Sequence, residues 1–321
     1  VLLGVLFSFG QVLQGVFHVR VFGDSGSMSI AQTLNVKSYD ATISKTGGLN
    51  IIIFVLFLSA GWYTQKSISA VKFLAVSALL ASGILLTFGR TTWGATLFGL
   101  IVVVYLLGLR KSGPMLILGL MASTLALVTL VAVKPAMLDA LVVRATSVGS
   151  EIDHGSSAGW RYYEVDEIVP KIIASPVLGL GLGAAYRRSA LSDVLPEQVR
   201  YIHNGYLYMV SKLGAPAFLL FIWCMLVVLT WSWRGTKTEP DPILRAVHAA
   251  ICAGIIGMFL ASVTEPHFMR DSSVAYLAVT AALSVVLKRH SGKPATAVKQ
   301  TTFRAGVRAT AAREIAGKRV G

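Results

Sequence analysis

The sequence predicts an all-α, polytopic integral membrane protein with one large loop outside the membrane. Two observations predict this fold class. Of the 321 residues, 55% are hydrophobic and only 14% are charged, and a soluble domain could not bury that much apolar surface. The apolar residues also gather in runs of about 20, the length that an α-helix needs to cross a bilayer.

Eight apolar runs are candidate transmembrane helices. They lie at residues 1–18, 48–65, 70–88, 92–109, 114–133, 205–233, 243–264 and 272–288. The first run has no basic lead-in, so it is not a signal peptide. A non-Met start or missing N-terminal helices would explain why the sequence begins inside an apolar run.

The runs divide the chain into four expected parts. The N-terminal transmembrane helices occupy residues 1–133, and a large loop follows at 134–204. The C-terminal transmembrane helices occupy 205–288, and a basic tail occupies 289–321. A polar stretch at 19–47 is expected to form a shorter external loop.

The distribution of Lys and Arg predicts the orientation, because cytoplasmic loops carry an excess of these residues. A cytoplasmic C-terminus places almost all of the net charge of +14 on the cytoplasmic side. The loop at 134–204 is then outside. The tail at 289–321 is basic enough for nucleic acid, but a solvated tail beside anionic lipid headgroups explains its charge, so we expect membrane lipids and no nucleic acid as partners.

Two arginines fall on the outer side in this orientation. Arg90 lies between two spans, and Arg161 opens a helix-like run within the large loop. A guanidinium is always charged and can bind phosphate oxygens in bidentate fashion. The alternatives are a snorkelling interfacial arginine for Arg90 and a weak surface pair with Glu164 for Arg161.

The carboxylates beside Arg161 are less promising. Glu164, Asp166 and Glu167 do not share one helical face. They make a poor metal site and an unconvincing acid–base pair.

A histidine on the same outer side is the candidate base. His203 precedes Asn204, a suitable N-cap for the run at 205–233. Gly214 and Pro216 are expected to split that run into an outer piece and a crossing piece. The positive end of the helix dipole disfavours imidazolium and leaves a neutral imidazole able to accept a proton. The alternative is a histidine hydrogen-bonded to a backbone carbonyl.

A glycine-rich turn lies between Arg161 and His203. Gly179, Gly181 and Gly183 form G-x-G-x-G, which differs from the dinucleotide fingerprint and follows no predicted strand. Glycines here favour a tight turn and a close approach to a neighbouring helix or a ligand.

Other motifs are weaker. The remaining histidines form no spacing typical of zinc, and Cys224 and Cys252 fall inside apolar runs, so neither a metal nor a disulfide is expected. Residues 265–267 (Glu-Pro-His) could line the site, although a helix-terminating turn explains them.

Together these features resemble the O-antigen ligase and polymerase superfamily of membrane glycosyltransferases. The likeness covers roughly residues 50–235. It rests on Arg90, Arg161, the segment from Pro176 to Gly183, His203, Asn204, Tyr206, Leu207, Lys212 and Gly214.

The resemblance implies a GT-C-like enzyme of the bacterial inner membrane that acts on its periplasmic face in lipopolysaccharide biosynthesis. Such an enzyme transfers a glycan from a polyprenyl-diphosphate donor to a saccharide acceptor, such as a lipid A-core sugar. The short distance from Arg161 to His203 leaves open a polysaccharide polymerase or a protein O-oligosaccharyltransferase of the same superfamily.

The resemblance also implies roles for individual residues. Arg90 and Arg161 would neutralise the departing diphosphate, and His203 would act as the base, with no metal or other cofactor. The expected substrate contacts come from Asn204, Gly181, Gly183 and Tyr206.

A transporter of lipid-linked sugars is the alternative of another class. It needs ionisable residues near the midplane of the membrane, whereas Lys72 and Arg245 lie near helix ends. A purely structural membrane subunit would leave the shared sidedness of Arg90, Arg161 and His203 unexplained.

Overall fold

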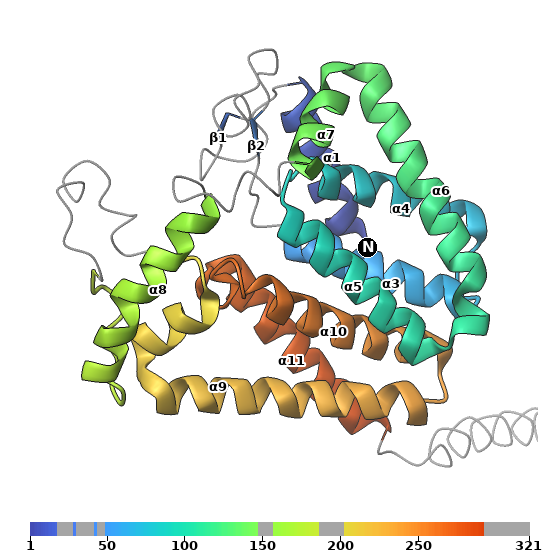
Figure 1. Ribbon diagram of the computed structural model, residues 1–321. Coiled ribbons are helices and arrows are strands. Elements are labelled where there is room, and N and C mark those ends of the chain that lie inside the picture. Colours follow the sequence, from blue (N-terminus) through green and yellow to red (C-terminus); the bar gives the residue numbers. More distant parts are fainter. Residues whose placement is uncertain (18–27, 30–41, 44–48, 147–156, 186–201, 292–321) are drawn as a thin grey trace, which may run out of the picture.

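The computed structural model describes residues 1–17, 28–29, 42–43, 49–146, 157–185 and 202–291 (Figure 1). This part of the chain contains ten α-helices and one two-stranded antiparallel ladder. The helices are α1 (Leu2–Phe17), α3 (Leu49–Thr64), α4 (Ala70–Leu85), α5 (Arg90–Leu107), α6 (Leu109–Val133), α7 (Ala136–Thr146), α8 (Ser157–Ala174), α9 (Gly205–Thr238), α10 (Pro242–Ala261) and α11 (Asp271–Ser291). The ladder pairs β1 (Met28–Ser29) with β2 (Thr42–Ile43), and a 3₁₀ turn, η2 (His267–Met269), precedes α11.

Each of the eight predicted apolar runs forms a helix. Five of these helices are long and apolar enough to cross a membrane, namely α5, α6, α9, α10 and α11. The other three, α1, α3 and α4, are apolar but have 16 residues each. The all-helical, polytopic membrane class is therefore confirmed.

Helices α5 and α6 begin two and five residues earlier than hydropathy predicts. α5 begins at Arg90, and α6 begins at Leu109, so the polar residues Arg110 and Lys111 lie inside its first turn. Both of these side chains are exposed. A helix can continue through such residues because its backbone hydrogen bonds do not depend on apolar side chains, and hydropathy therefore sets the boundary too late.

Helix α10 lies at the centre of the bundle. It packs against α3, α5 and α9 through small buried side chains, among them Ala249 and Ala253. Gly61 of α3 approaches Ala246 so closely that a Cβ at Gly61 would lie 2.9 Å from the alanine methyl. Lipid tails are as apolar as the side chains, so close van der Waals packing between small residues holds such helices together.

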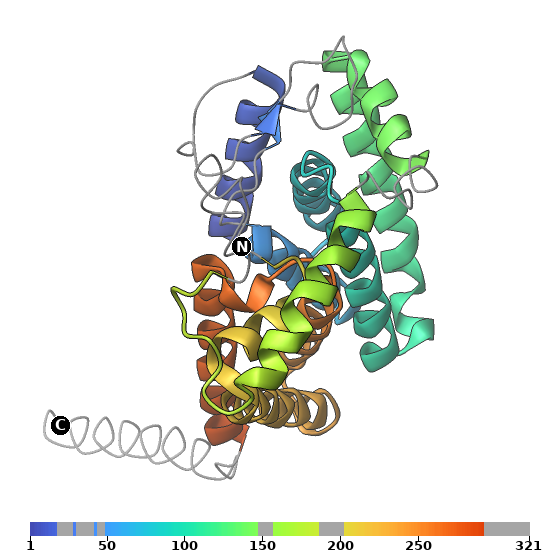
Figure 2. The ribbon, with the colours of Figure 1, turned by 60° about the vertical axis from the view of Figure 1, so that its left-hand side comes forward.

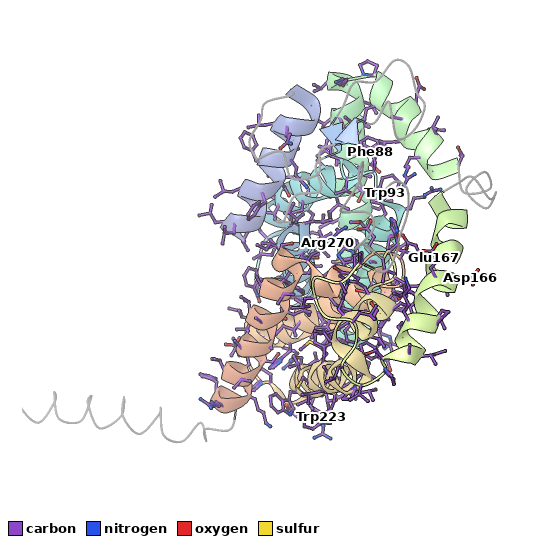
Figure 3. The ribbon with its side chains drawn as sticks, turned by 90° about the vertical axis from the view of Figure 1, so that its left-hand side faces the viewer. Phe88, Trp93, Asp166, Glu167, Trp223 and Arg270 are labelled. Atoms are coloured by element: carbon purple, nitrogen blue, oxygen red, sulfur yellow. The ribbon has the colours of Figure 1, made fainter. Side chains whose placement is uncertain are left out.

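Helices α6 and α9 face outward. Leu116 and Leu120 of α6, and Leu219 and Trp223 of α9, are large apolar side chains that are exposed in the isolated chain. Trp223 projects from the outer surface of α9 in Figure 3. These faces suit contact with lipid.

Three hydrogen bonds join helix ends at one end of the bundle. Asn50 Nδ2 donates to Ser273 Oγ over 2.9 Å, and this bond ties the start of α3 to the start of α11. The hydroxyls of Thr91 and Thr264 lie 2.8 Å apart, and the Gly205 N–H donates to the Ser262 carbonyl over 2.7 Å. We call this the loop end, because α8 lies across it in Figures 1 and 2. The opposite end, where α9 and α11 finish and α10 begins, is the tail end.

Helix α9 is kinked at Gly214, as the sequence predicts. Gly214 has φ 79° and ψ 166°, which divides α9 into an outer piece and a crossing piece. The glycine-rich turn binds at the kink, where the Leu180 N–H donates to the Ser211 carbonyl over 2.7 Å. A Cβ at Gly179 would lie 2.6 Å from the Gly214 nitrogen. The predicted close approach of the glycine-rich turn to a neighbouring helix is thus confirmed for Gly179.

Candidate functional site

A carboxylate–imidazole pair lies at the loop end. Glu164 Oε1 is 2.8 Å from Nδ1 of His203, and Glu164 Oε2 accepts the backbone N–H of His203 over 2.8 Å. The Glu164 side chain is 3% exposed and that of His203 is 32% exposed. An ionised carboxylate only accepts hydrogen bonds, so it favours the tautomer with the proton on Nδ1. Nε2 then carries the lone pair that can take a proton from a ligand.

Helix α8 positions Glu164. Glu164, Ile168 and Ile172 follow one another at intervals of four residues and so share one helical face. Ile168 is fully buried and packs with Ile202 and Leu207 at the start of α9. The two isoleucines pack α8 against α9. Glu164 lies one turn before Ile168 on the same face, so its carboxylate is buried in the same contact.

The start of α9 positions His203. Asn204 is the N-cap that the sequence predicts, and its Oδ1 accepts the N–H groups of Tyr206 and Leu207 over 3.0 Å each. Gly205 lies against the end of α10, where an added Cβ would be 3.0 Å from the carbonyl oxygen of Ser262. His203 is therefore held just outside the first turn of α9.

The predicted substrate contacts have different surroundings. The Tyr206 hydroxyl donates to the Phe259 carbonyl over 2.7 Å, which fixes α9 to α10. A Cβ at Gly181 or Gly183 would meet nothing within 4 Å among the described residues. The buried Lys212 donates through Nζ to the Ala184 carbonyl, and this hydrogen bond ties the end of the glycine-rich turn to α9. Gly181 and Gly183 are both exposed in the part of the chain that the structure describes.

The predicted arginines share the loop end. Arg90 is the first residue of α5, and both terminal nitrogens of its guanidinium are buried. Its neighbour Thr91 contacts Thr264 after α10, next to the segment that binds Gly205. Arg161 belongs to α8, but its side chain lies outside those that the structure describes.

Two further arginines at this end escaped the sequence analysis. Arg144 of α7 donates through Nε to the carbonyl of Phe88 over 2.8 Å, two residues before Arg90. Phe88 adopts φ 48°, which turns that carbonyl toward α7. Arg270 forms an ion pair with Glu265 at 2.9 Å. Figure 3 looks at the loop end, with Phe88, Arg270 and Glu167 labelled.

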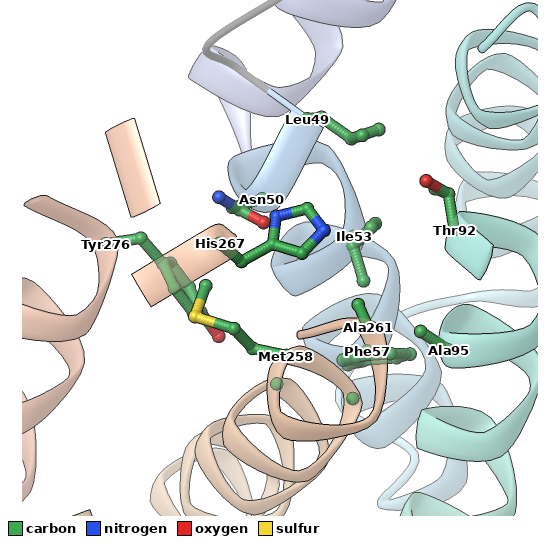
Figure 4. A pocket seen from close by; sticks show the side chains of 12 residues that line it. Leu49, Asn50, Ile53, Phe57, Thr92, Ala95, Met258, Ala261, His267 and Tyr276 are labelled. Carbon is green, nitrogen blue, oxygen red and sulfur yellow. The ribbon is translucent and has the colours of Figure 1, made fainter. Parts of the chain in front are cut away.

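His267 lines a small cavity that is separate from the Glu164–His203 pair. Its N–H donates to the Glu265 carbonyl over 2.8 Å, so the helix-terminating turn expected at 265–267 is present. Figure 4 shows its imidazole in a cavity of about 30 Å³, with Thr92 on the opposite wall. Neither His203 nor Glu164 lines that cavity.

The position of Glu164 differs from the one expected from the sequence. A surface pair with Arg161 and no acid–base role were expected for this residue, but its carboxylate is buried against His203. A signal was available, since Glu164 falls on the same helical stripe as Ile168 and Ile172. A carboxylate on the apolar face of a helix needs a partner, because an unpaired buried charge is costly.

An apolar groove is lined in part by the first half of α5. It has a volume of about 350 Å³ and lies between α4, α5 and α6, with Leu56 of α3 at its edge. Trp93, one turn after Arg90, lines it and donates through its indole N–H to the Ile84 carbonyl over 3.0 Å. The groove extends from the start of α5 into the apolar part of the bundle.

Comparison with known families gives one match. A family model described as O-antigen ligase matches residues 75–222. The matched range includes Arg90, Arg161, Glu164, the glycine-rich turn and His203, and it ends within α9. No curated protein matches the chain.

Proposed function

Because the chain carries an O-antigen ligase family domain over residues 75–222, we propose that it is a membrane glycosyltransferase with a GT-C-like mechanism. It transfers a glycan from polyprenyl diphosphate to an acceptor hydroxyl, with a lipid A-core sugar as the acceptor. The observation that carries this proposal is the buried Glu164 carboxylate, which contacts both the Nδ1 atom and the backbone N–H of His203.

The proposed step is a displacement at the anomeric carbon. The acceptor oxygen forms a bond to that carbon, and the bond from the carbon to the diphosphate oxygen breaks. The diphosphate leaves with the electron pair, and Nε2 of His203 takes the hydroxyl proton. Attack from the face opposite the leaving group inverts the anomeric centre. Glu164 stabilises the imidazolium that forms, without taking its proton.

The donor is proposed to bind through both its charged diphosphate and its apolar polyprenyl chain. The diphosphate develops negative charge as it leaves, and the guanidinium groups of Arg90 and Arg161 neutralise it. The polyprenyl chain occupies the apolar groove that begins at Trp93. The position of Arg90 one turn before Trp93 supports this arrangement, because it places a cation where the groove meets the loop end.

Replacing either proposed diphosphate ligand tests the donor site. We expect Arg90→Ala and Arg161→Ala each to raise the donor KM by about tenfold or more, since charge-assisted hydrogen bonds are worth about 1.5–3 kcal/mol. Arg→Lys should rescue binding only in part, because an ammonium group cannot make bidentate contacts. The measurement is donor-dependent transfer by purified variants that remain folded in detergent.

Arg110→Ala is the matched control for these variants. It removes an exposed arginine of α6 beyond the last turn of α5, at the opposite end of α5 from Arg90. Unchanged transfer in Arg161→Ala would remove that residue from the site, and an equal loss in Arg110→Ala would point to a general charge effect.

The proposed orientation places the loop end in the periplasm and the C-terminus in the cytoplasm of a bacterial inner membrane. The excess of Lys and Arg at the tail end and in the residues that follow supports it. A reporter enzyme that works only in the cytoplasm should be active when it is fused after Arg289. A reporter that works only in the periplasm would reverse the orientation and would move His203 to the cytoplasmic face.

A further inference from the structure

Another cavity opens at the tail end, on the opposite side of the bundle from His203. Its volume is about 170 Å³, and it lies between α9, α10 and α11. It is lined by Trp231, Arg234, Gly235, Thr238, His248 and Lys288. The proposed glycosyl transfer uses none of these residues.

Two cations from different helices line this cavity. Arg234 of α9 and Lys288 of α11 are both exposed. The Lys288 ammonium lies 3.8 Å from the centre of the Trp231 ring, and this cation–π contact holds it beside the cavity rather than out in solvent. A guanidinium and an ammonium that converge from two helices make an anion site.

Two carboxylates at this end lie outside the lining. Glu239 is buried, and its Oε1 accepts the Asp241 N–H over 3.2 Å. Asp241 caps α10 and accepts the Ile243 N–H over 2.8 Å. Glu239 acts electrostatically on His248, and the charged residues of the lining itself are Arg234 and Lys288.

A buried histidine supplies an independent observation. His248 of α10 is 2% exposed, and neither of its ring nitrogens hydrogen-bonds to any residue that the structure describes. Its imidazole packs directly on Gly235, where an added Cβ would lie 2.5 Å from Cδ2. A buried polar group without a partner is destabilising, so the site is incomplete until a ligand accepts a hydrogen bond from this ring.

We propose that this cavity binds a phosphate group, carried either by an anionic membrane phospholipid or by a free phosphate. Its volume is several times the share of one water molecule, about 30 Å³, so it can admit a phosphate and its ester oxygens. Arg234 and Lys288 neutralise the charge, and the His248 ring donates a hydrogen bond to a phosphate oxygen. The cavity lies where apolar helices end, with Trp231 beside it, which is the level of lipid headgroups.

The proposal can be tested by ligand binding to the purified full chain. The probes are dihexanoyl phosphatidylglycerol, dihexanoyl phosphatidylcholine and inorganic phosphate, and the readouts are the dissociation constant and the shift in Tm. We expect the double variant Arg234→Gln, Lys288→Gln to weaken binding by about tenfold or more, since it removes two charge-assisted contacts. His248→Gln should weaken binding while leaving both charges in place.

The control is the double variant Lys237→Gln, Arg289→Gln. It removes the same charge from the same end, but neither residue lines the cavity. Binding of phosphatidylglycerol that depends on Arg234 and Lys288 identifies a lipid headgroup, and binding of inorganic phosphate with the same dependence, without phosphatidylglycerol, identifies a free phosphate. The proposal is overturned if no probe binds, if phosphatidylcholine binds as tightly as phosphatidylglycerol regardless of the variant, or if the control pair weakens binding equally.

Discussion

Replacing His203 by alanine is expected to lower glycan transfer by about 100-fold to 10,000-fold, the usual scale for a positioned acid–base group. The Nδ1 atom of His203 lies 2.8 Å from the Glu164 carboxylate, and the His203 side chain is 32% exposed. Donor binding should survive, because the proposed arginines and the apolar groove remain. Initial rates of transfer at saturating donor, compared with donor affinity, separate these two effects.

His290→Ala serves as the matched control, since His290 is exposed in the last turn of α11 at the tail end. Near-normal transfer by His203→Ala contradicts a base at this position. Joint loss of donor binding and transfer would instead make His203 a phosphate ligand or a structural residue.

Glu164→Gln is expected to lower transfer by about 10-fold to 100-fold, the scale seen when a group that orients a functional histidine is replaced. Glutamine keeps the size of the side chain and can still accept the His203 N–H, but it loses the charge that stabilises the imidazolium. The loss should therefore appear in the rate at saturating donor and not in donor affinity, since the proposed base acts only in the transfer step.

Glu167→Gln is the control for this change, because Glu167 lies on the same helix and is exposed. Glu164→Asp should rescue poorly, since its carboxylate is one methylene too short to reach both His203 groups. Transfer at the parent rate by Glu164→Gln, or a loss confined to donor affinity, would show that the carboxylate does not act through the imidazole.

Much of the fold follows from local sequence. The apolar runs become helices because a backbone in lipid must satisfy its hydrogen bonds internally. The kink of α9 follows from Gly214, since only glycine readily adopts its positive φ, and the cap of α9 follows from Asn204. The helices, the kink and the cap each depend on a few residues that are neighbours in the sequence, so they can be predicted from the sequence alone.

The central contact of the site could not be predicted in the same way. Glu164 and His203 are 39 residues apart, and they meet only because Ile168 and Ile202 pack α8 onto the start of α9. The approach of Arg144 to the Phe88 carbonyl likewise depends on how α7 returns to the bundle. Residues that are distant in the sequence become neighbours through helix packing, which hydropathy does not describe.

The most direct test of the glycosyltransferase proposal is transfer by the purified chain in proteoliposomes. These would contain a defined polyprenyl-diphosphate glycan and a lipid A-core acceptor, and the products would be resolved by size. We predict that the acceptor gains one glycan, that polyprenyl diphosphate is released in equal amount, and that His203→Ala abolishes both changes. A ladder of products would identify a polymerase with the same chemistry. Movement of intact lipid-linked glycan across the bilayer, with no glycosidic product and no effect of His203→Ala, would contradict the account.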